Sequence, residues 1–207
     1  IRNAKHGMLN AACRLACSAF SIPHSSFLRG SMSQRQLAVR VHTTTEGIGR
    51  GEPQPHLHGV ISKELHGDGD DRQIFREIIR STDEFFVEGF GQLSYALMYP
   101  GSAKAWHLHQ QQVDWWYVPI GALKLALHDL RPDSPTYQQT QEILLGPDYG
   151  HRVVKIPPGV AHGCKVLGGV THLFYVTSNV YNPADEGRIP HDDPGIGYDW
   201  LALPPIK

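Results

Sequence analysis

Four residues in the second half of the chain have side chains that could bind a metal ion or move a proton. His107 and His109 are two residues apart in a predicted strand, so both imidazoles face the same side. Asp114 follows five residues later, and His162 comes just after a predicted turn at 157–159. Imidazole serves as acid, base or metal ligand near neutral pH. Three imidazoles and a carboxylate suit Fe, Mn, Ni, Cu or Zn and leave room for water or substrate.

The spacing of these residues resembles the two motifs of the cupin superfamily. The run from Gly101 to Gly121 resembles the first motif, with Asp114 where glutamate is usual. The segment from Pro157 to His162 resembles the second, although Val166 stands where its closing asparagine is expected. In metal-binding cupins the matching residues share one ion. A histidine pair alone is weak support, because a second pair at 56 and 58 falls in a proline-rich loop and is attributed to chance.

Short strands separated by turn residues must position these side chains. Apolar runs that end at glycine, proline or asparagine recur from residue 92 onward, which is typical of an all-β sandwich or barrel with few short helices. The segment 72–81 fits a helix and a strand equally well. The expected strands are 37–44, 59–65, 92–99, 103–110, 113–120, 122–130, 152–156 and 171–178.

Composition limits the class of protein. The chain has 207 residues, a net charge of -1 and a pI near 7.0. We therefore expect neither nucleic acid nor an anionic membrane as partner. No apolar run approaches the ~20 residues that span a bilayer. Three cysteines with no obvious pairing favour a reducing compartment, the cytoplasm.

The first 31 residues differ in composition from the rest of the chain. They are basic and serine-rich, and the first acidic residue is Glu46. An organelle transit peptide has this composition. An upstream extension before a start at Met32 explains it equally well. We expect residues 1–45 to be an N-terminal extension, for targeting or disordered, and residues 46–207 to form one cupin-type domain.

From Gly59 to Trp200 the sequence resembles the dTDP-4-dehydrorhamnose 3,5-epimerase family. The segments "DDRQIFRE", "GALKLALHDLRPDSPTY" and "IPPGVAHG" match family motifs in the right order. The last stretch is the most specific, and its matching residues are Tyr181, Pro183, Glu186, Asp193, Pro194, Ile196, Gly197 and Trp200.

The resemblance implies a jelly-roll barrel that forms a homodimer and needs no cofactor. It implies a nucleotide-linked 4-keto-6-deoxyhexose as substrate, with epimerisation by proton removal beside the keto group. By position, His109 falls on the family's base and Tyr175 on its proton donor. The other matching positions contact substrate or nucleotide, and they are Arg72, Phe75, Glu77 and His162.

Several positions depart from the family pattern. The lysine that stabilises the enolate is replaced by Asp114, an arginine by Trp106 and a glycine by His107. No match is found for the aspartate that supports the base. Because two of these changes each add a metal ligand, we hypothesise that a divalent transition metal replaced the lysine. Two alternatives stay open: a metal-dependent cupin with other chemistry on a small polar substrate, and a sugar-binding cupin without catalysis.

Other polar and aromatic residues have simpler interpretations. The tryptophans near the site, including Trp116, are expected mainly to pack the core. Cys164 is expected to be a small buried apolar residue. We expect Lys124, His128 and Lys155 on the exposed face or rim of the barrel.

Overall fold

The computed structural model describes residues 56–202. The predictions for the extension at 1–45, its targeting role, the boundary at 45/46 and the strand at 37–44 lie outside the described residues. Within the described part, no helix is long and apolar enough to cross a membrane.

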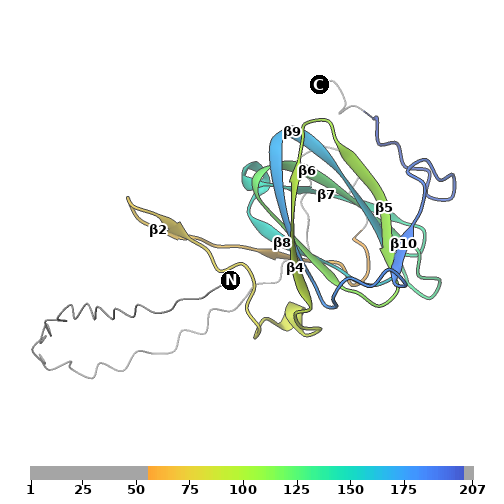
Figure 1. The fold of residues 1–207 in the computed structure, drawn as a ribbon, viewed down its shortest axis with the longest axis horizontal. Helices are drawn as coiled ribbons and strands as arrows, with labels where there is room; N and C mark the ends of the chain where they lie inside the picture. The colour runs from red at the N-terminus through yellow and green to blue at the C-terminus, as the bar shows by residue number, and fades with distance from the viewer. Residues whose placement is uncertain (1–55, 203–207) are drawn as a thin grey trace, which may run out of the picture. The chain divides into compact units, whose positions relative to one another are not determined.

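Residues 56–202 form one eight-stranded antiparallel sheet and a separate two-stranded hairpin (Figure 1). The regular helical structure of this part is limited to two 3₁₀ turns, Glu84–Phe86 and Pro147–Tyr149. The all-β prediction is therefore confirmed, and the ambiguous segment 72–81 contains a short strand rather than a helix. The strands are β1 (Ile61–Glu64), β2 (Asp68–Gly69), β3 (Ile74–Phe75), β4 (Gln92–Met98), β5 (Ala103–His109), β6 (Asp114–Asp129), β7 (Thr140–Leu145), β8 (Arg152–Ile156), β9 (Val160–Thr177) and β10 (Glu186–Arg188).

Two long strands, β6 and β9, pair with each other along most of their length. Strand β6 pairs with β8 near its start and with β7 near its end. Strand β9 pairs first with β5 and then with β4. The remaining strands complete the order β1-β8-β6-β9-β5-β10. Because β6 and β9 change partners along their length, one continuous sheet wraps around a common interior (Figure 1).

The prediction of two strands on either side of Gly121 is wrong, because β6 runs through this position. Gly121 has a φ of 89°, and the pairing with β9 shifts register nearby. Glycine adopts this conformation without steric cost, so it bends the strand instead of ending it. The alternation of inward side chains resumes at Leu123.

The barrel interior is filled by alternate residues of the facing strands. Side chains at 123, 125 and 127 of β6 are fully buried there, as are those at 143 and 145 of β7. Burial of this apolar surface stabilises the barrel. A second cluster, which contains Trp115 and Phe86, covers an outer face.

The expectation that His128 and Lys155 are exposed is wrong. His128 is 2% exposed, and its Nδ1 lies 2.8 Å from Oγ1 of Thr140. The ammonium group of Lys155 donates to Glu88 Oε1 at 2.6 Å. Both residues lie on strands whose outer faces are covered by other segments. Alternation of polar and apolar residues along one strand cannot reveal that cover. Lys124 is half-buried and pairs with Glu142.

Candidate active site

Strands β5, β6 and β9 bring the sequence-predicted histidines and Asp114 to one cavity of about 390 Å³. His107 on β5 pairs in register with His162 on β9, and their ring centroids lie 6.1 Å apart. The ring of His109 is 5.7 Å from that of His162. The three imidazoles therefore converge on the inner wall, as the spacing predicted.

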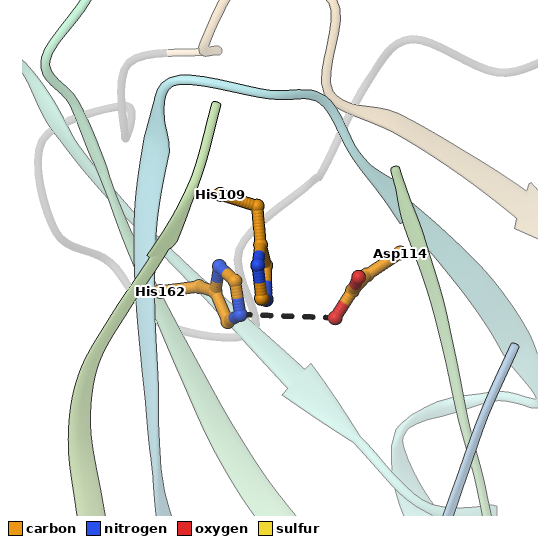
Figure 2. Close-up of side chains that lie close together, drawn as sticks. All are labelled: His109, Asp114 and His162. Atoms are coloured by element: carbon orange, nitrogen blue, oxygen red, sulfur yellow. Dashed lines mark ion pairs between the residues drawn. The ribbon is translucent and has the colours of Figure 1, made fainter. Parts of the chain in front are cut away.

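Three of the four side chains form a closer group (Figure 2). One ligand atom each from His109, Asp114 and His162 lies within 4.8 Å of the other two. The Nε2 atom of His162 is 3.8 Å from Oδ2 of Asp114. His107 is outside this group, because its Nδ1 faces Glu186 Oε1 at 3.5 Å. Its role as a fourth ligand stays a prediction.

Main-chain carbonyls fix the tautomers of two histidines. His109 Nδ1 lies 3.3 Å from the carbonyl oxygen of Asp185, and His162 Nδ1 lies 3.2 Å from that of Val160. A carbonyl oxygen can only accept, so both Nδ1 atoms must donate. When these imidazoles are neutral, their Nε2 lone pairs are directed into the cavity. The carbonyl of Asp185 therefore orients His109, for which the sequence had shown no orienting partner.

The cavity favours neutral histidines. Burial lowers the pKa of His162 to about 4, although the carboxylate of Asp114 acts in the opposite direction. Burial also lowers the pKa of His107, and the positive charge of Arg188 adds to this effect. At neutral pH both rings are therefore uncharged, and their unprotonated nitrogens can accept a hydrogen bond or bind a cation.

Asp114 is held by two donors. The amide nitrogen of Gln112 donates to its Oδ1 at 2.8 Å, and the indole N–H of Trp116 donates to its Oδ2 at 3.2 Å. The same Gln112 nitrogen lies 3.3 Å from His109 Nε2. One amide thus bridges the predicted base His109 and the carboxylate of Asp114.

Tyr175, the predicted proton donor, lines the same cavity from β9. It pairs in register with Trp116, and the two ring centroids are 6.2 Å apart. Trp116 also meets His162 edge to face at 5.5 Å. Trp116 and Cys164 are buried as expected, and both also line the cavity.

The predicted nucleotide contacts lie away from this cavity within one chain. Arg72 and Phe75 belong to the β2–β3 hairpin, and the arm that carries β2 projects from the barrel in Figure 1. Arg72 pairs with Asp70, and Glu77 pairs with Arg80. The cavity lining contains none of the three predicted nucleotide-contact residues, so their substrate-binding role stays a prediction.

Sequence reasoning missed several residues that shape the site. The carboxylate of Asp185 accepts the backbone N–H groups of residues 110, 111 and 112 and so fixes the turn between β5 and β6. The position of Gln112, two residues before Asp114, is the one feature of the sequence that could have indicated its contact with Asp114. Lys104 and Arg188 also line the cavity. No spacing pattern indicated them, because a register shift separates Lys104 from His107 and Arg188 lies in a short strand.

An antiparallel barrel with histidines converging on an interior cavity defines a cupin-like protein. The chain belongs to the dTDP-4-dehydrorhamnose 3,5-epimerase family, whose model matches residues 54–207. It is 44% identical over 147 residues to the spore coat polysaccharide biosynthesis protein SpsL of Bacillus subtilis, covering 70% of this chain and 96% of SpsL. It is 35% identical over 154 residues to the probable low-salt glycan biosynthesis epimerase Agl13 of Haloferax volcanii, covering 72% and 97%.

Solved structures share the fold. A dTDP sugar isomerase from Desulfovibrio desulfuricans superposes with a TM-score of 0.67 at 25% identity, over 72% of this chain and 94% of that one. The RmlC epimerase of Legionella pneumophila, in complex with dTDP-4-keto-L-rhamnose, gives 0.64 at 25% identity, over 74% and 85%. The predicted jelly-roll fold and the family resemblance are confirmed, and the family places the chain among isomerase-class enzymes.

Proposed function

We propose that this protein inverts a carbon beside the keto group of a nucleotide-linked 4-keto-6-deoxy sugar. The observation that carries the proposal is that His109 and Tyr175 line one cavity in a chain of the epimerase family. The names of similar structures support the substrate class: one is a 4-keto-6-deoxy sugar epimerase, and another contains dTDP-4-keto-L-rhamnose.

In the proposed reaction, His109 Nε2 accepts the proton from the carbon beside the keto group. The C–H bond breaks, its electron pair forms the carbon–carbon double bond of an enolate, and the keto oxygen takes the negative charge. The hydroxyl of Tyr175 then donates a proton to the opposite face of that carbon. The tyrosine regains a proton and His109 releases one, so nothing is consumed. Epimerases of this type need no cofactor.

Solvent deuterium tests this function directly. The protein is incubated in D₂O with a dTDP-linked 4-keto-6-deoxyhexose, and deuterium at the carbons beside the keto group is followed by NMR. We expect incorporation with the wild-type protein and none with His109→Gln. Binding of the sugar without any incorporation would favour the alternative of a sugar-binding module without catalysis.

A metal centre is a second candidate, supported by the short distances among His109, Asp114 and His162. Both histidines donate through Nδ1 and direct Nε2 into the cavity, as metal-binding histidines do when a carbonyl orients them. The donor set fits a divalent transition metal. Such an ion would polarise the keto oxygen. It would also have to compete with the Gln112 amide for the same lone pairs, and it would occupy the nitrogen needed by the base.

The substitution Asp114→Lys separates the two candidates, because it restores the family's lysine and removes one metal ligand. If the protein works without metal, we expect faster epimerisation and no bound metal in either form. If it works with metal, elemental analysis should find about one ion per wild-type chain, and the variant should lose both metal and activity. Asp114→Ala and His107→Ala then show which residues the ion needs.

The proposal includes a homodimer. Ile74 and Phe75 on the hairpin are 62% and 58% exposed. The outer face of β4 carries Leu93, Tyr95 and Leu97, which are also exposed. Apolar groups exposed in this number favour contact with a second copy. We infer that the hairpin delivers Arg72, Phe75 and Glu77 to the partner's cavity, where they contact the nucleotide.

We also place the enzyme in the reducing cytoplasm. Cys164 is a buried free cysteine, and burial raises the pKa of its thiol to about 12. Free thiols are typical of reducing compartments. Microscopy of a fluorescent fusion at the C-terminus tests this location, and a signal confined to an organelle would instead support targeting by residues 1–31.

A further inference from the structure

Two positively charged side chains line the cavity and have no part in the proposed proton transfer. Lys104 lies on β5 and Arg188 on β10, next to each other in the sheet order. Arg188 pairs in register with His107, three residues along β5 from Lys104. Both cations therefore lie on the wall that β5 and β10 build.

A change of register directs Lys104 into the cavity. In a regular strand, residues three apart face opposite sides, so Lys104 and His107 would be separated. The pairing of β5 with β9 shifts between them. Trp106 faces outward and packs against Trp200. A bulge of this kind re-aims side chains, and here it puts a lysine on the cavity wall beside Cys164, its partner in register.

Positive charge exceeds negative charge on this wall. One carboxylate, Glu186, pairs with Arg188 and also faces His107. The Arg188 side chain is 71% exposed, so most of its five N–H donors are accessible to a ligand. Among residues 56–202, Lys104 forms no ion pair. An anion entering the cavity would therefore meet a free ammonium group and a guanidinium.

We propose that Lys104 and Arg188 bind the diphosphate of the nucleotide-linked substrate. This inference rests on the proposed function and assigns a subsite within it. A guanidinium binds phosphate oxygens in pairs, and an ammonium adds a point charge. With the diphosphate on this wall, the sugar extends toward His109 and Tyr175. Neither cation falls on a family motif residue, and the arginine expected near this strand is the outward-facing Trp106.

Calorimetric titration of the whole chain tests the subsite with three probes: dTDP, thymidine and inorganic pyrophosphate. The variants are Lys104→Met and Arg188→Gln. Lys124→Met is the matched control, because Lys124 pairs with Glu142 and does not line the cavity. We expect each cavity variant to weaken dTDP binding at least about 10-fold, the loss of one charge-assisted contact. Thymidine binding and the control should be unchanged.

Each result decides the inference. Wild-type binding of dTDP that weakens with salt, together with losses in both variants, supports it even if no epimerisation occurs; in that case only the proposed function fails. Unchanged dTDP affinity in both variants overturns the subsite and leaves the function intact. Equal losses for thymidine and dTDP also overturn it, because they indicate altered structure instead of lost phosphate contacts. A wild-type protein that binds neither dTDP nor pyrophosphate overturns it as well.

Discussion

At the residue scale, the site depends on which nitrogen of each histidine carries a proton. Asp185 and Val160 accept from Nδ1 of His109 and His162 through main-chain oxygens. A carbonyl cannot change its protonation, so this orientation holds across the physiological pH range. The main chain therefore orients His109, the proposed base, without the carboxylate that the resemblance led us to expect.

The roles of acid and base can be separated by removing one hydroxyl. Tyr175→Phe should still exchange deuterium beside the keto group, because His109 is intact. It should form the epimerised product about 10²–10⁴-fold more slowly, since the second face loses its proton donor. NMR of the reaction in D₂O measures both quantities. Tyr117→Phe is the matched control, because its hydroxyl faces His151 outside the cavity. Equal rates in Tyr175→Phe and wild type would exclude Tyr175 as donor.

A second residue-scale prediction concerns stability. Asp129 is fully buried, and although burial acts to raise its pKa, hydrogen bonds from Arg131, Ser134 and Thr136 hold it well below its usual range. A depressed carboxyl pKa stabilises the fold above the unfolded pKa of about 3.9 and does so less as pH falls. Asp129→Asn should cost about 3–5 kcal/mol at pH 7.

The pH dependence of the stability lost in Asp129→Asn tests whether the carboxylate charge causes that loss. Between pH 5 and pH 3, the difference in unfolding free energy between wild type and Asp129→Asn should shrink by about 1 kcal/mol. Urea titrations at several pH values measure it. Asp133→Asn, an exposed change in the same loop, serves as control. A constant difference over this range would mean that packing, and not the carboxylate charge, accounts for the cost.

The sequence predicted the site's location better than its contacts. Two-residue spacing and a proline–glycine turn were enough to bring His107, His109 and His162 together, because strand alternation fixes their face. The bridge made by Gln112 and the support from Asp185 depend on the path of a turn, which no periodic pattern encodes. The roles proposed for Arg72 and its neighbours require a second chain, which a single sequence describes only by resemblance.

At the scale of elements, β6 is the strand that contributes side chains both to the site and to the core of the barrel. Its first half carries Asp114 and Trp116 into the cavity, and its second half fills the core. The bend at Gly121 lets one strand serve both regions. A Cβ at this position would lie 2.4 Å from Thr171 Oγ1 and 2.6 Å from Thr171 Cα, so the backbone itself would have to move.

Gly121→Ala should therefore destabilise the fold by at least about 3 kcal/mol, from positive φ and backbone collision together. Gly168→Ala, in β9, is the matched control because a Cβ there meets no atom within 4 Å. The control should change stability by less than about 1 kcal/mol. Chemical denaturation measures both. Similar values for the two variants would show that the bend does not depend on glycine.

The turn between β5 and β6 makes a further prediction. Asp185→Ala removes the acceptor of three backbone N–H groups and should cost about 1.5–3 kcal/mol of stability. It should also lower kcat more than it raises KM, because the turn positions Gln112 and His109. Asp193→Ala, which removes one such contact in the C-terminal segment, is the control. An unchanged kcat in Asp185→Ala would mean that the turn keeps its conformation without the hydrogen bonds to the Asp185 carboxylate.

Predicting elements from this sequence succeeded where alternation was clear and ended in a turn residue, as in β4, β5 and β8. It failed where a turn residue lay inside a strand, as at Gly121. It also missed β7, in which Gln141 is buried and breaks the usual relation between polarity and exposure. Tertiary pairing overrode local pattern in both cases.

At the scale of the whole molecule, the main feature is that the site histidines and the predicted nucleotide-contact residues lie in different parts of the fold. The histidines lie inside the barrel, whereas the hairpin with Arg72 and Phe75 extends away from it (Figure 1). In the proposed function, a substrate that is part sugar and part nucleotide contacts both groups at once. A second copy resolves the separation if its hairpin reaches the first copy's cavity, and the exposed apolar face of β4 offers surface for the contact.

Charge placed on that face should separate the copies. On β4, Leu97 is 44% exposed and belongs to the same outward row as Tyr95. Leu97→Glu should convert a dimer into monomers in sedimentation experiments, because a carboxylate buried without a partner costs several kcal/mol. The Leu97→Glu variant should remain folded by circular dichroism, since the side chain at position 97 points away from the core.

Leu201→Glu is the matched control, because Leu201 is 83% exposed and lies outside both apolar surfaces. It should leave the dimer intact. If the dimer completes the cavity, Leu97→Glu should also weaken dTDP binding, and mixing it with a His109→Gln variant should not restore activity. A monomeric wild type with full epimerase activity would contradict the dimer, and the hairpin would then have to bind nucleotide by folding back within its own chain.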